Sequence, residues 1–482
     1  MAVMPFFFGL AVGLLCPFVI VRAGYRITLH PLAKFPGPKL AGISSLYQAS
    51  FDLRSSTSYI KQFHALHKKY SPIIGTRYAC YRDNYNQEAA DGFFNVLDPK
   101  AAKLWRDAYQ PCFAKAAIIR LEPLIHDRIK KFLSALEAAS STGTVVDLSR
   151  GCRSLTSDVV TSYMFADKGF ETLDAEGFQS PTLVDLEEFF EFTQWAMYFP
   201  NFMGWLTRQL QKLTKEQTEK FMPTLAATNW ITEQCGIKVK EILREGGSGS
   251  SFSTVFDAWA RPSEKREFTP TLKQLTADAF TFHGAGTDTT AHALTTATWV
   301  LINNKESLEK PREELKGAIP EPHGERLVSS SILESLPYLR AVVKEALRMS
   351  MGIPGGMCRV VPEGGAVLCQ QQIPAGVGIT SVCYCHHYDP AYFPSPNEFR
   401  PDRWLGPDGQ QLETRLIARS CIGVNLAYAE LHLNLGYVFR KFDLEAFETT
   451  ERDMEWKDNF VVTTKGHLRV KLRRASDDEE KE

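Results

Sequence analysis

The sequence has no excess of charge of either sign. Its 482 residues contain 55 Lys and Arg and 56 Asp and Glu, so the formal net charge is -1. Proteins that bind nucleic acids through charge carry a basic surface, so this balance argues against nucleic acid as a partner. The ten cysteines include no C-x-x-C pair and no regular spacing. That usage favours free thiols in a reducing compartment over a disulfide framework.

Several catalytic motifs are also missing. The sequence contains no H-E-x-x-H, no G-x-S-x-G and no G-x-x-x-x-G-K-[ST], which removes the common zinc-protease, α/β-hydrolase and phosphate-loop signatures. It also has no internal repeats. Cys383-x-Cys385 and His386-His387 stand close together, but no further ligand follows at metal-site spacing. We interpret them as structural residues of a strand-to-loop stretch.

Charge is absent from the first 21 residues. A helix of this length spans roughly 32 Å, enough for the apolar core of a bilayer. We therefore predict a transmembrane anchor over 1–21. The basic residues that follow, beginning with Arg22 and Arg26, favour a cytosolic body and a lumenal amino terminus. The alternative is a buried amino-terminal helix of a soluble protein. Residues 22–40 are basic and contain Pro36-Gly37-Pro38, which predicts a stiff hinge.

The body of the chain has helical periodicity up to about residue 347 and strand-like alternation afterwards. The sequence therefore predicts a fold that is mainly α with a small β portion (α+β). A Gly-Ser-rich loop lies at 246–250, a terminal hairpin is expected near 459–472, and a charged tail occupies 473–482. The clearest predicted helices cover 59–69, 101–113, 118–136, 183–198, 215–244, 272–303 and 426–439.

The helix predicted over 272–303 contains the segment Ala285-Gly286-Thr287-Asp288-Thr289-Thr290. Gly284 and Gly286 each cost about 1 kcal/mol in a helix interior, so a flat group is expected to approach the backbone here. Asp288 and Thr289 supply an acid and a hydroxyl at the same level, which is typical of a proton relay. The alternative is a buried helix whose threonine hydroxyls bond to earlier carbonyls.

Glu345-x-x-Arg348 places a carboxylate and a guanidinium on one face of another predicted helix. Such a pair is usually an exposed ion pair of small energetic value. Arg403, in the segment "FRPDRW", could complete a network with both.

Cys421 lies just before the helix predicted over 426–439, where free N–H groups and the helix dipole favour a thiolate. Gly423 allows close approach of the backbone, and Arg419 stands two residues upstream. A lone cysteine is more often a small buried apolar residue, and the flanking Arg, Gly and helix start shift that balance.

Four features occur in this order and spacing: the segment 285–290, Glu345-x-x-Arg348, "FRPDRW" and the surroundings of Cys421. Together they resemble the haem-thiolate monooxygenases, the cytochromes P-450. The resemblance covers nearly the whole chain. Segments such as "FHGAGTDTTAHALTTATWVL" and "CIGVNLAYAEL" are most similar to the fungal microsomal branch that includes trichodiene-oxygenase-like enzymes. The resemblance implies the cytochrome P-450 fold, with a single large haem-enclosing domain over 41–472 behind the transmembrane helix.

The resemblance also implies roles for single residues. Cys421 would be the axial thiolate ligand of the iron in haem b, and Asp288 and Thr289 would deliver protons to bound oxygen. Glu345, Arg348 and Arg403 would support the proximal side. The other implied cofactor-binding residues are Arg419, Arg359 and Arg106, which would pair with haem propionates, Ala285 and Gly286, which would leave room above the porphyrin, and Gly423 beside the ligand.

The sequence departs from the family pattern before the cysteine. Thr414 stands where the pattern has Phe, and Ile417 where it has its first Gly. The segments 404–421 and 75–95 are short for the family. A degenerate or truncated member with impaired haem binding is therefore one alternative, and a haem-thiolate isomerase or dehydratase is another.

The implied function is insertion of one oxygen atom from O₂ into an apolar small molecule, of terpenoid or polyketide type, in secondary metabolism. Electrons would come from NADPH through a flavoprotein reductase, with a cytochrome b-type protein as another donor. Arg415, Arg440 and Lys441 could help to dock that acidic partner, or could be plain solvated surface. Membrane lipid is a further expected partner. The expected location is the endoplasmic reticulum membrane, single-pass, with the catalytic domain in the cytosol.

Overall fold

A computed structural model describes residues 3–54, 58–70, 92–96, 98–210, 212–260, 268–321, 324, 327–417 and 421–475. Its contacts divide the chain into two compact units, each built from separate segments of the sequence. The smaller unit comprises Met1–Asn84, Gln194–Trp205 and Gly355–Cys385, and the larger one comprises Tyr85–Thr193, Leu206–Pro354 and His386–Glu482.

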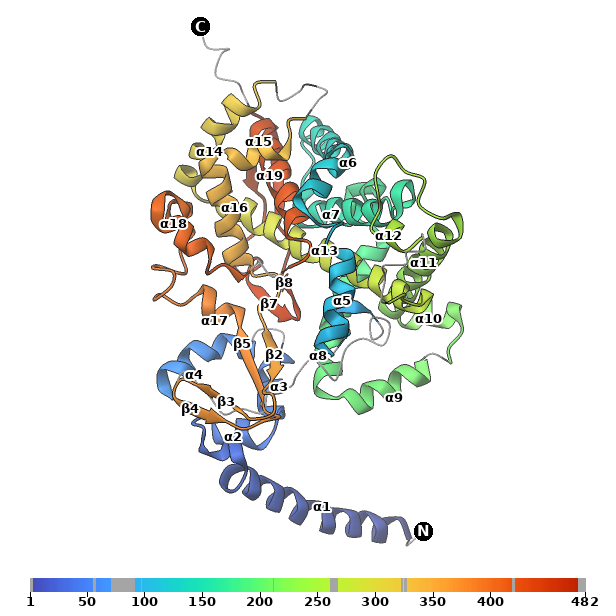
Figure 1. Cartoon of the computed structure of the whole chain (residues 1–482), viewed down its shortest axis with the longest axis vertical. Helices are drawn as coiled ribbons and strands as arrows, with labels where there is room; N and C mark the ends of the chain where they lie inside the picture. Colours follow the sequence, from blue (N-terminus) through green and yellow to red (C-terminus); the bar gives the residue numbers. More distant parts are fainter. Residues whose placement is uncertain are drawn as a thin grey trace. The chain divides into compact units, whose positions relative to one another are not determined.

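The smaller unit combines short helices with two antiparallel strand pairs (Figure 1). Strand β2 pairs with β5, and β3 with β4, which confirms the short strands and turns expected after residue 348. The first helix ends before Pro31, as expected for a residue that cannot continue a helix. The elements are α1 (Val3–Thr28), α2 (Lys39–Ile43), α3 (Leu46–Asp52), α4 (Phe63–Lys69), β2 (Gly356–Val360), β3 (Ala366–Leu368), β4 (Gln371–Ile373) and β5 (Gly378–Val382).

Among the residues that the structure describes, no helix is both long enough and apolar enough to cross a membrane. The transmembrane anchor expected over 1–21 falls mainly on residues 1–15, whose side chains lie outside the described part of the chain.

The larger unit is mostly helical. In Figure 1 the long helix α13 (Leu272–Ile302) passes through this unit, where it packs against α7, α11, α16 and α19. The other helices that lie in this unit or extend into it are α5 (Pro99–Tyr109), α6 (Lys115–Thr142), α7 (Leu148–Phe165), α8 (Pro181–Tyr198), α9 (Pro200–Leu210), α10 (Lys215–Phe221), α11 (Pro223–Glu245), α12 (Asp257–Ala260), α14 (Lys305–Ala318), α15 (Ser330–Ser335), α16 (Pro337–Ser350), α17 (Cys383–His387), α18 (Gly406–Glu413) and α19 (Val424–Lys441).

Local chemistry fixes where these helices begin and end. The Thr271 side chain accepts a hydrogen bond from the Gln274 backbone, and the Gln274 side chain bonds back to the Thr271 backbone. This capping box starts α13 at the predicted place. The single helix predicted over 215–244 is wrong, because it is divided into α10 and α11. Pro223 lacks the N–H that a continuous helix needs, and it stands instead at the first position of α11.

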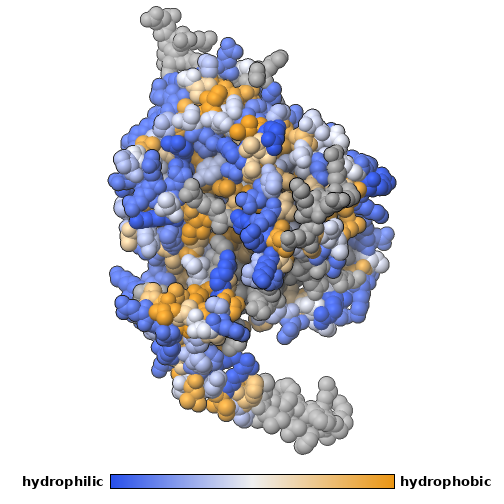
Figure 2. Space-filling view, viewed as in Figure 1, coloured by the Kyte–Doolittle hydropathy of each residue, from blue (hydrophilic) through white to orange (hydrophobic). Residues whose placement is uncertain are grey.

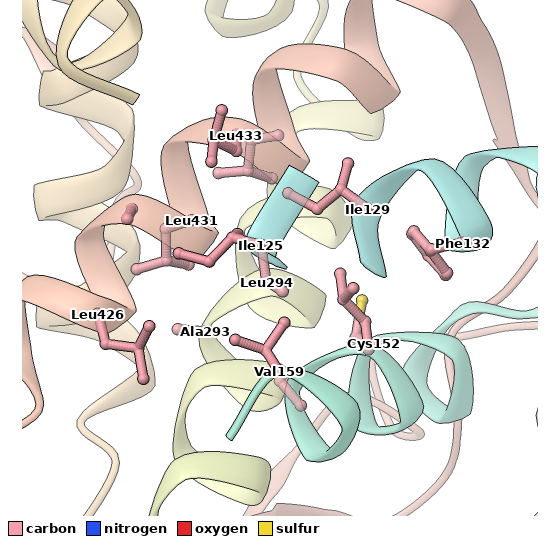
Figure 3. Close-up of a cluster of buried hydrophobic side chains, with 14 of the residues drawn as sticks. Ile125, Ile129, Phe132, Cys152, Val159, Ala293, Leu294, Leu426, Leu431 and Leu433 are labelled. Carbon is pink, nitrogen blue, oxygen red and sulfur yellow. The ribbon is translucent and has the colours of Figure 1, made fainter. Parts of the chain in front are cut away.

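The core of the larger unit forms where four helices meet. Figure 3 shows Ile125, Ile129 and Phe132 of α6 facing side chains of α7, α13 and α19. Leu294 of α13 is fully buried in this cluster. Each such side chain contributes about 1.5–3 kcal/mol by leaving water, so α13 is held on several sides.

Strands of the larger unit form one three-stranded sheet and one hairpin. The sheet has the order β1 (Val146–Asp147), β9 (Arg469–Arg474), β6 (Phe442–Ala446). The hairpin joins β7 (Trp456–Asn459) to β8 (Val461–Thr464). The terminal hairpin predicted near 459–472 is therefore wrong in its pairing. β8 pairs with β7, the strand before it in the chain, and β9 pairs with β6 and β1.

Candidate functional site

Glu345, Arg348, Arg403 and Trp404 form a hydrogen-bonded group in the larger unit, called the Glu345 network. Both Glu345 and Arg348 are fully buried on α16. Arg348 Nε donates to Glu345 Oε2 at 2.9 Å, and its Nη2 donates to Oε1 at 2.8 Å. The resulting two-pronged ion pair is the strong form of the interaction. The spacing thus gives a buried pair and not the exposed one that is statistically more common.

Further donors reach the same carboxylate from the segment that ends in the short 3-10 helix η8 (Pro401–Trp404). Arg403 Nε bonds Glu345 Oε1 at 3.1 Å, which confirms the network expected from the sequence. Trp404 Nε1 donates to Oε2 at 2.8 Å. We did not identify Trp404 from the sequence, although it closes the same "FRPDRW" segment. Together these bonds fix η8 against α16.

Cys421 lies at the amino end of α19, two residues before its cap, Gly423. Its side chain is accessible to solvent, yet surrounding protein raises the pKa of the thiol by burial. The Gly423 amide and the positive charge of Arg106 act on this pKa in the opposite direction. Burial outweighs these two effects, so a further positive charge such as a metal cation would favour the ionised form of the thiol.

The three arginines expected to pair with propionates lie in different parts of the chain. Arg106 is exposed on α5, within electrostatic range of Cys421 in the same unit. Arg359 lies on β2 of the smaller unit, where its Nη1 donates to the Cys358 carbonyl at 3.0 Å. Arg419 lies outside the described residues. The structure thus brings Arg106 toward the cysteine, while the roles of Arg359 and Arg419 remain predictions.

The middle of α13 has one open position. Ala285 is the one exposed residue between Gln274 and Ile302. Thr289, one turn later, donates its hydroxyl to the Ala285 carbonyl at 2.8 Å. A Cβ added to Gly286 would lie 2.8 Å from Val160 Cγ2, so close packing against α7 is one reason for this glycine. Its predicted role toward the cofactor is not tested by this contact.

Asp288 faces a second polar region of the larger unit. Its Oδ1 accepts a hydrogen bond from Arg153 Nε at 2.7 Å, and the same arginine donates to the Leu183 carbonyl at 3.0 Å. A cavity of about 260 Å³, lined also by His292 and Lys457, opens beside this ion pair. Asp288 thus lies in an ion pair beside a polar cavity, and its role in proton delivery stays a prediction. We did not predict Arg153 as its partner, because 135 residues separate the two in the chain.

A larger cavity of about 510 Å³ lies among α16, α18 and α19. Charged side chains line it, including Arg340, Lys344 and Glu413. This lining does not suit an apolar substrate, because charged groups lose hydration when an oily molecule covers them.

Two of the basic residues considered for partner docking are not on the surface. Arg440 is buried and donates its Nε to the Ile319 carbonyl at 3.0 Å. Lys441 is also buried and forms an ion pair with Glu137. Both stabilise the carboxyl end of α19. Arg415 is half-buried, with its guanidinium 5.3 Å from the ring centre of Tyr392.

Comparisons with known proteins place this architecture in one family. The cytochrome P450 family model matches residues 63–471. The chain is 31% identical to cytochrome P450 monooxygenase sdnE of Sordaria araneosa, over 93% of this chain and 94% of that protein. It is 28% identical to cytochrome P450 monooxygenase TRI4 of Trichoderma arundinaceum, over 96% of each. The chain belongs to the cytochrome P450 family.

Solved structures support the fold. The heme domain of cytochrome P450DA superposes with a TM-score of 0.67 over 83% of each chain, at 18% identity. The alignment with sdnE runs over 506 positions, more than the 482 residues of this chain. That relative therefore carries residues with no counterpart in this chain.

Family and fold imply haem b with a cysteine thiolate as axial ligand, and the described residues fit this group. Cys421 offers an accessible sulfur at a helix amino end, where N–H groups favour negative charge. Arg106 adds a positive charge nearby for that sulfur or for a propionate. Ala285 provides an open position on the long helix.

Proposed function

We propose that the protein is a haem-dependent monooxygenase that inserts one oxygen atom from O₂ into an apolar small molecule of fungal secondary metabolism. Terpenoids and polyketides are the substrate classes that we expect. The accessible thiol of Cys421 at the start of α19 carries the proposal. The similar fungal proteins sdnE, aneF and TRI4 are all named cytochrome P450 monooxygenases, which supports it.

When bound, haem would supply the oxygen-activating chemistry, with the Cys421 thiolate as its protein ligand. The protein's own residues hold the group and control protons around it. Cys421 binds the iron, and Arg106 offsets the charge of a carboxylate. Asp288, which borders the polar cavity, and the Thr289 hydroxyl, which bonds the Ala285 carbonyl, would deliver protons to the reaction.

A difference spectrum of the reduced protein with and without carbon monoxide tests this function. We expect the Soret band of a thiolate-ligated haem. A well-folded protein that lacks this band would contradict the proposal and favour a degenerate family member. Turnover that proceeds without NADPH and O₂ would instead favour an isomerase or dehydratase.

We also propose that an NADPH-dependent flavoprotein reductase supplies the electrons, with a cytochrome b-type protein as a second donor. Arg415 remains a candidate contact because it is partly accessible and precedes the cysteine by six residues. Reconstitution with a reductase at increasing salt tests this. The rate should fall with ionic strength if charges guide docking.

We further propose a single-pass location in the endoplasmic reticulum membrane with the catalytic domain in the cytosol. The absence of charge from 1–21 and the basic residues after it support this. Exposed apolar side chains in the smaller unit add support, and Figure 2 shows apolar surface on that unit around α2 and the end of α1. They include Leu29, Leu40, Leu46, Trp195, Phe202 and Trp205.

Carbonate extraction of membranes tests the location. The full chain should stay in the membrane pellet. A variant without residues 1–21 should be released, or should bind weakly through the aromatic side chains alone. Release of the full chain by carbonate would contradict the proposal.

A further inference from the structure

Two neighbouring histidines at the end of α17 both bond to the chain segment that leads to Cys421. His387 Nδ1 lies 3.0 Å from the Arg348 carbonyl oxygen, and His387 Nε2 lies 3.1 Å from the Ile417 amide nitrogen. A carbonyl oxygen can only accept, so Nδ1 carries the proton. Nε2 is then free to accept from the Ile417 N–H. Both bonds require one tautomer of a neutral ring.

The surroundings of His387 maintain that neutral state. The side chain is 2% exposed. Burial lowers its pKa to about 3, and the charges of His386 and Arg348 act in the same direction. A ring that is never protonated near neutral pH keeps Nε2 available as an acceptor.

His386 bonds to the same segment with the opposite role. Its Nε2 donates to the Arg415 carbonyl oxygen at 2.7 Å. The histidine pair, His386 and His387, thus satisfies one carbonyl and one amide two residues apart. Between them, Leu416 is buried against Phe393 and Trp404. Residues 415–417 are therefore fixed by two hydrogen bonds and one apolar contact.

This attachment connects the Glu345 network to residues 415–417. Arg348 donates to the His387 backbone carbonyl at 2.9 Å, while its own carbonyl accepts from the His387 ring. The network is thus joined through one side chain to Ile417, four residues before Cys421. The same stretch has Thr414 and Ile417 where the family pattern has Phe and Gly.

We propose that His387 is a positioning residue that holds the segment before Cys421 against α16 and so sets where the thiolate lies. The inference rests on the proposed function in that Cys421 must bind haem. It gives the His386-His387 pair, set aside in the sequence as structural, a defined role. It also corrects the strand-to-loop prediction for that pair, since both residues end a short helix.

Two substitutions separate the two bonds of the ring. In the full-length protein, His387→Asn keeps a donor near the position of Nδ1 but cannot reach Ile417. His387→Gln places an amide oxygen near the position of Nε2 and can still accept from Ile417. Hydrogen exchange of the Ile417 amide should be about tenfold faster in His387→Asn and near the wild-type rate in His387→Gln. The carbon monoxide difference spectrum should keep more of its thiolate band in His387→Gln.

His432→Asn is the matched control. His432 is also buried with a pKa lowered to about 4, but its Nδ1 bonds only within its own helix, to the Tyr428 carbonyl at 2.7 Å. This change should leave exchange at Ile417 unaltered. Equal exchange rates in His387→Asn and His387→Gln would overturn the proposal. Equal loss of the thiolate band in these two variants and the control would also overturn it. If the wild type binds no haem, the proposed function fails, while the exchange comparison still tests the attachment.

Discussion

The Glu345 network and the ligand loop, residues 414–423, share Arg348 and His387 but are stabilised in different ways. In the network, opposite charges meet inside the protein, and a single carboxylate accepts from Arg348, Arg403 and Trp404. In the described part of the loop, the side chains of His386 and His387, which lie outside the loop, form hydrogen bonds with its backbone. Charge pairs at helical spacing are recognisable in a sequence. Backbone groups satisfied by distant side chains are not, because any loop offers the same amides and carbonyls.

The largest effect is expected from the ligand itself. Cys421→Ala should abolish the thiolate-type Soret band, because it removes the sulfur that is proposed to bind the iron. The helix cap at Gly423 and the buried face of α19 are untouched, so far-ultraviolet circular dichroism should be unchanged. The carbon monoxide difference spectrum measures the effect.

Cys369→Ser provides the control for this change. Cys369 is exposed in the turn between β3 and β4, in the smaller unit. Its loss should leave the spectrum intact. A thiolate band that survives in Cys421→Ala would show that another cysteine is the ligand.

The second effect tests the network. Glu345→Ala should lower the free energy of unfolding by about 3–5 kcal/mol, because it leaves Arg348 buried without its carboxylate. Urea denaturation monitored by circular dichroism measures it. Glu345→Gln should cost less, since an amide oxygen still accepts from one donor. A loss near zero for Glu345→Ala would mean that the network is solvated.

A smaller effect comes from a buried carboxylate that has only neutral donors. Asp278 on α13 accepts from the Phe93 amide, Trp105 Nε1 and Tyr109 hydroxyl, at 2.6, 3.0 and 2.7 Å. Burial raises the pKa of Asp278 to about 7, and these bonds only partly oppose the shift. Between about pH 4 and pH 7 the folded protein therefore holds a proton that the unfolded chain has released.

The raised pKa of Asp278 makes the folded protein less stable as the pH rises. The contribution of Asp278 to stability is present at low pH and is lost as the pH rises through 7. Raising the pH from 5 to 8 should therefore lower the free energy of unfolding by about 2–3 kcal/mol through the ionisation of Asp278. Asp278→Asn should flatten the profile over this range. Urea midpoints at both pH values give the comparison, and an unchanged pH profile in the variant would refute the assignment.

The sequence predicted what depends on local pattern. It predicted the helix over 272–303, the Glu345-x-x-Arg348 pair and the position of Cys421 before the helix that the structure shows as α19. It did not predict contacts between residues distant in the chain. Arg153 meets Asp288 across 135 residues of sequence, and His387 meets Ile417 across 30, so no spacing rule relates them. Strand pairing failed for the same reason, since β9 finds β6 and β1 instead of its sequence neighbour.

The smallest effect is expected from an exposed ion pair, which separates the influence of burial on ion-pair strength from that of helical spacing. Lys103 and Asp107 on α5 form an ion pair at 2.6 Å, with the lysine side chain 76% exposed. Its i,i+4 spacing is as recognisable as that of Glu345 and Arg348, and its distance is shorter. Water and salt screen such a pair, and two long side chains lose freedom to form it. Lys103→Ala should therefore leave the urea midpoint within experimental error, at low salt as at high salt. A loss comparable to that of Glu345→Ala would mean that helical spacing alone predicts the strength of an ion pair. A negligible loss of stability in Lys103→Ala would mean that the buried pair on α16 is stronger because water is excluded from it.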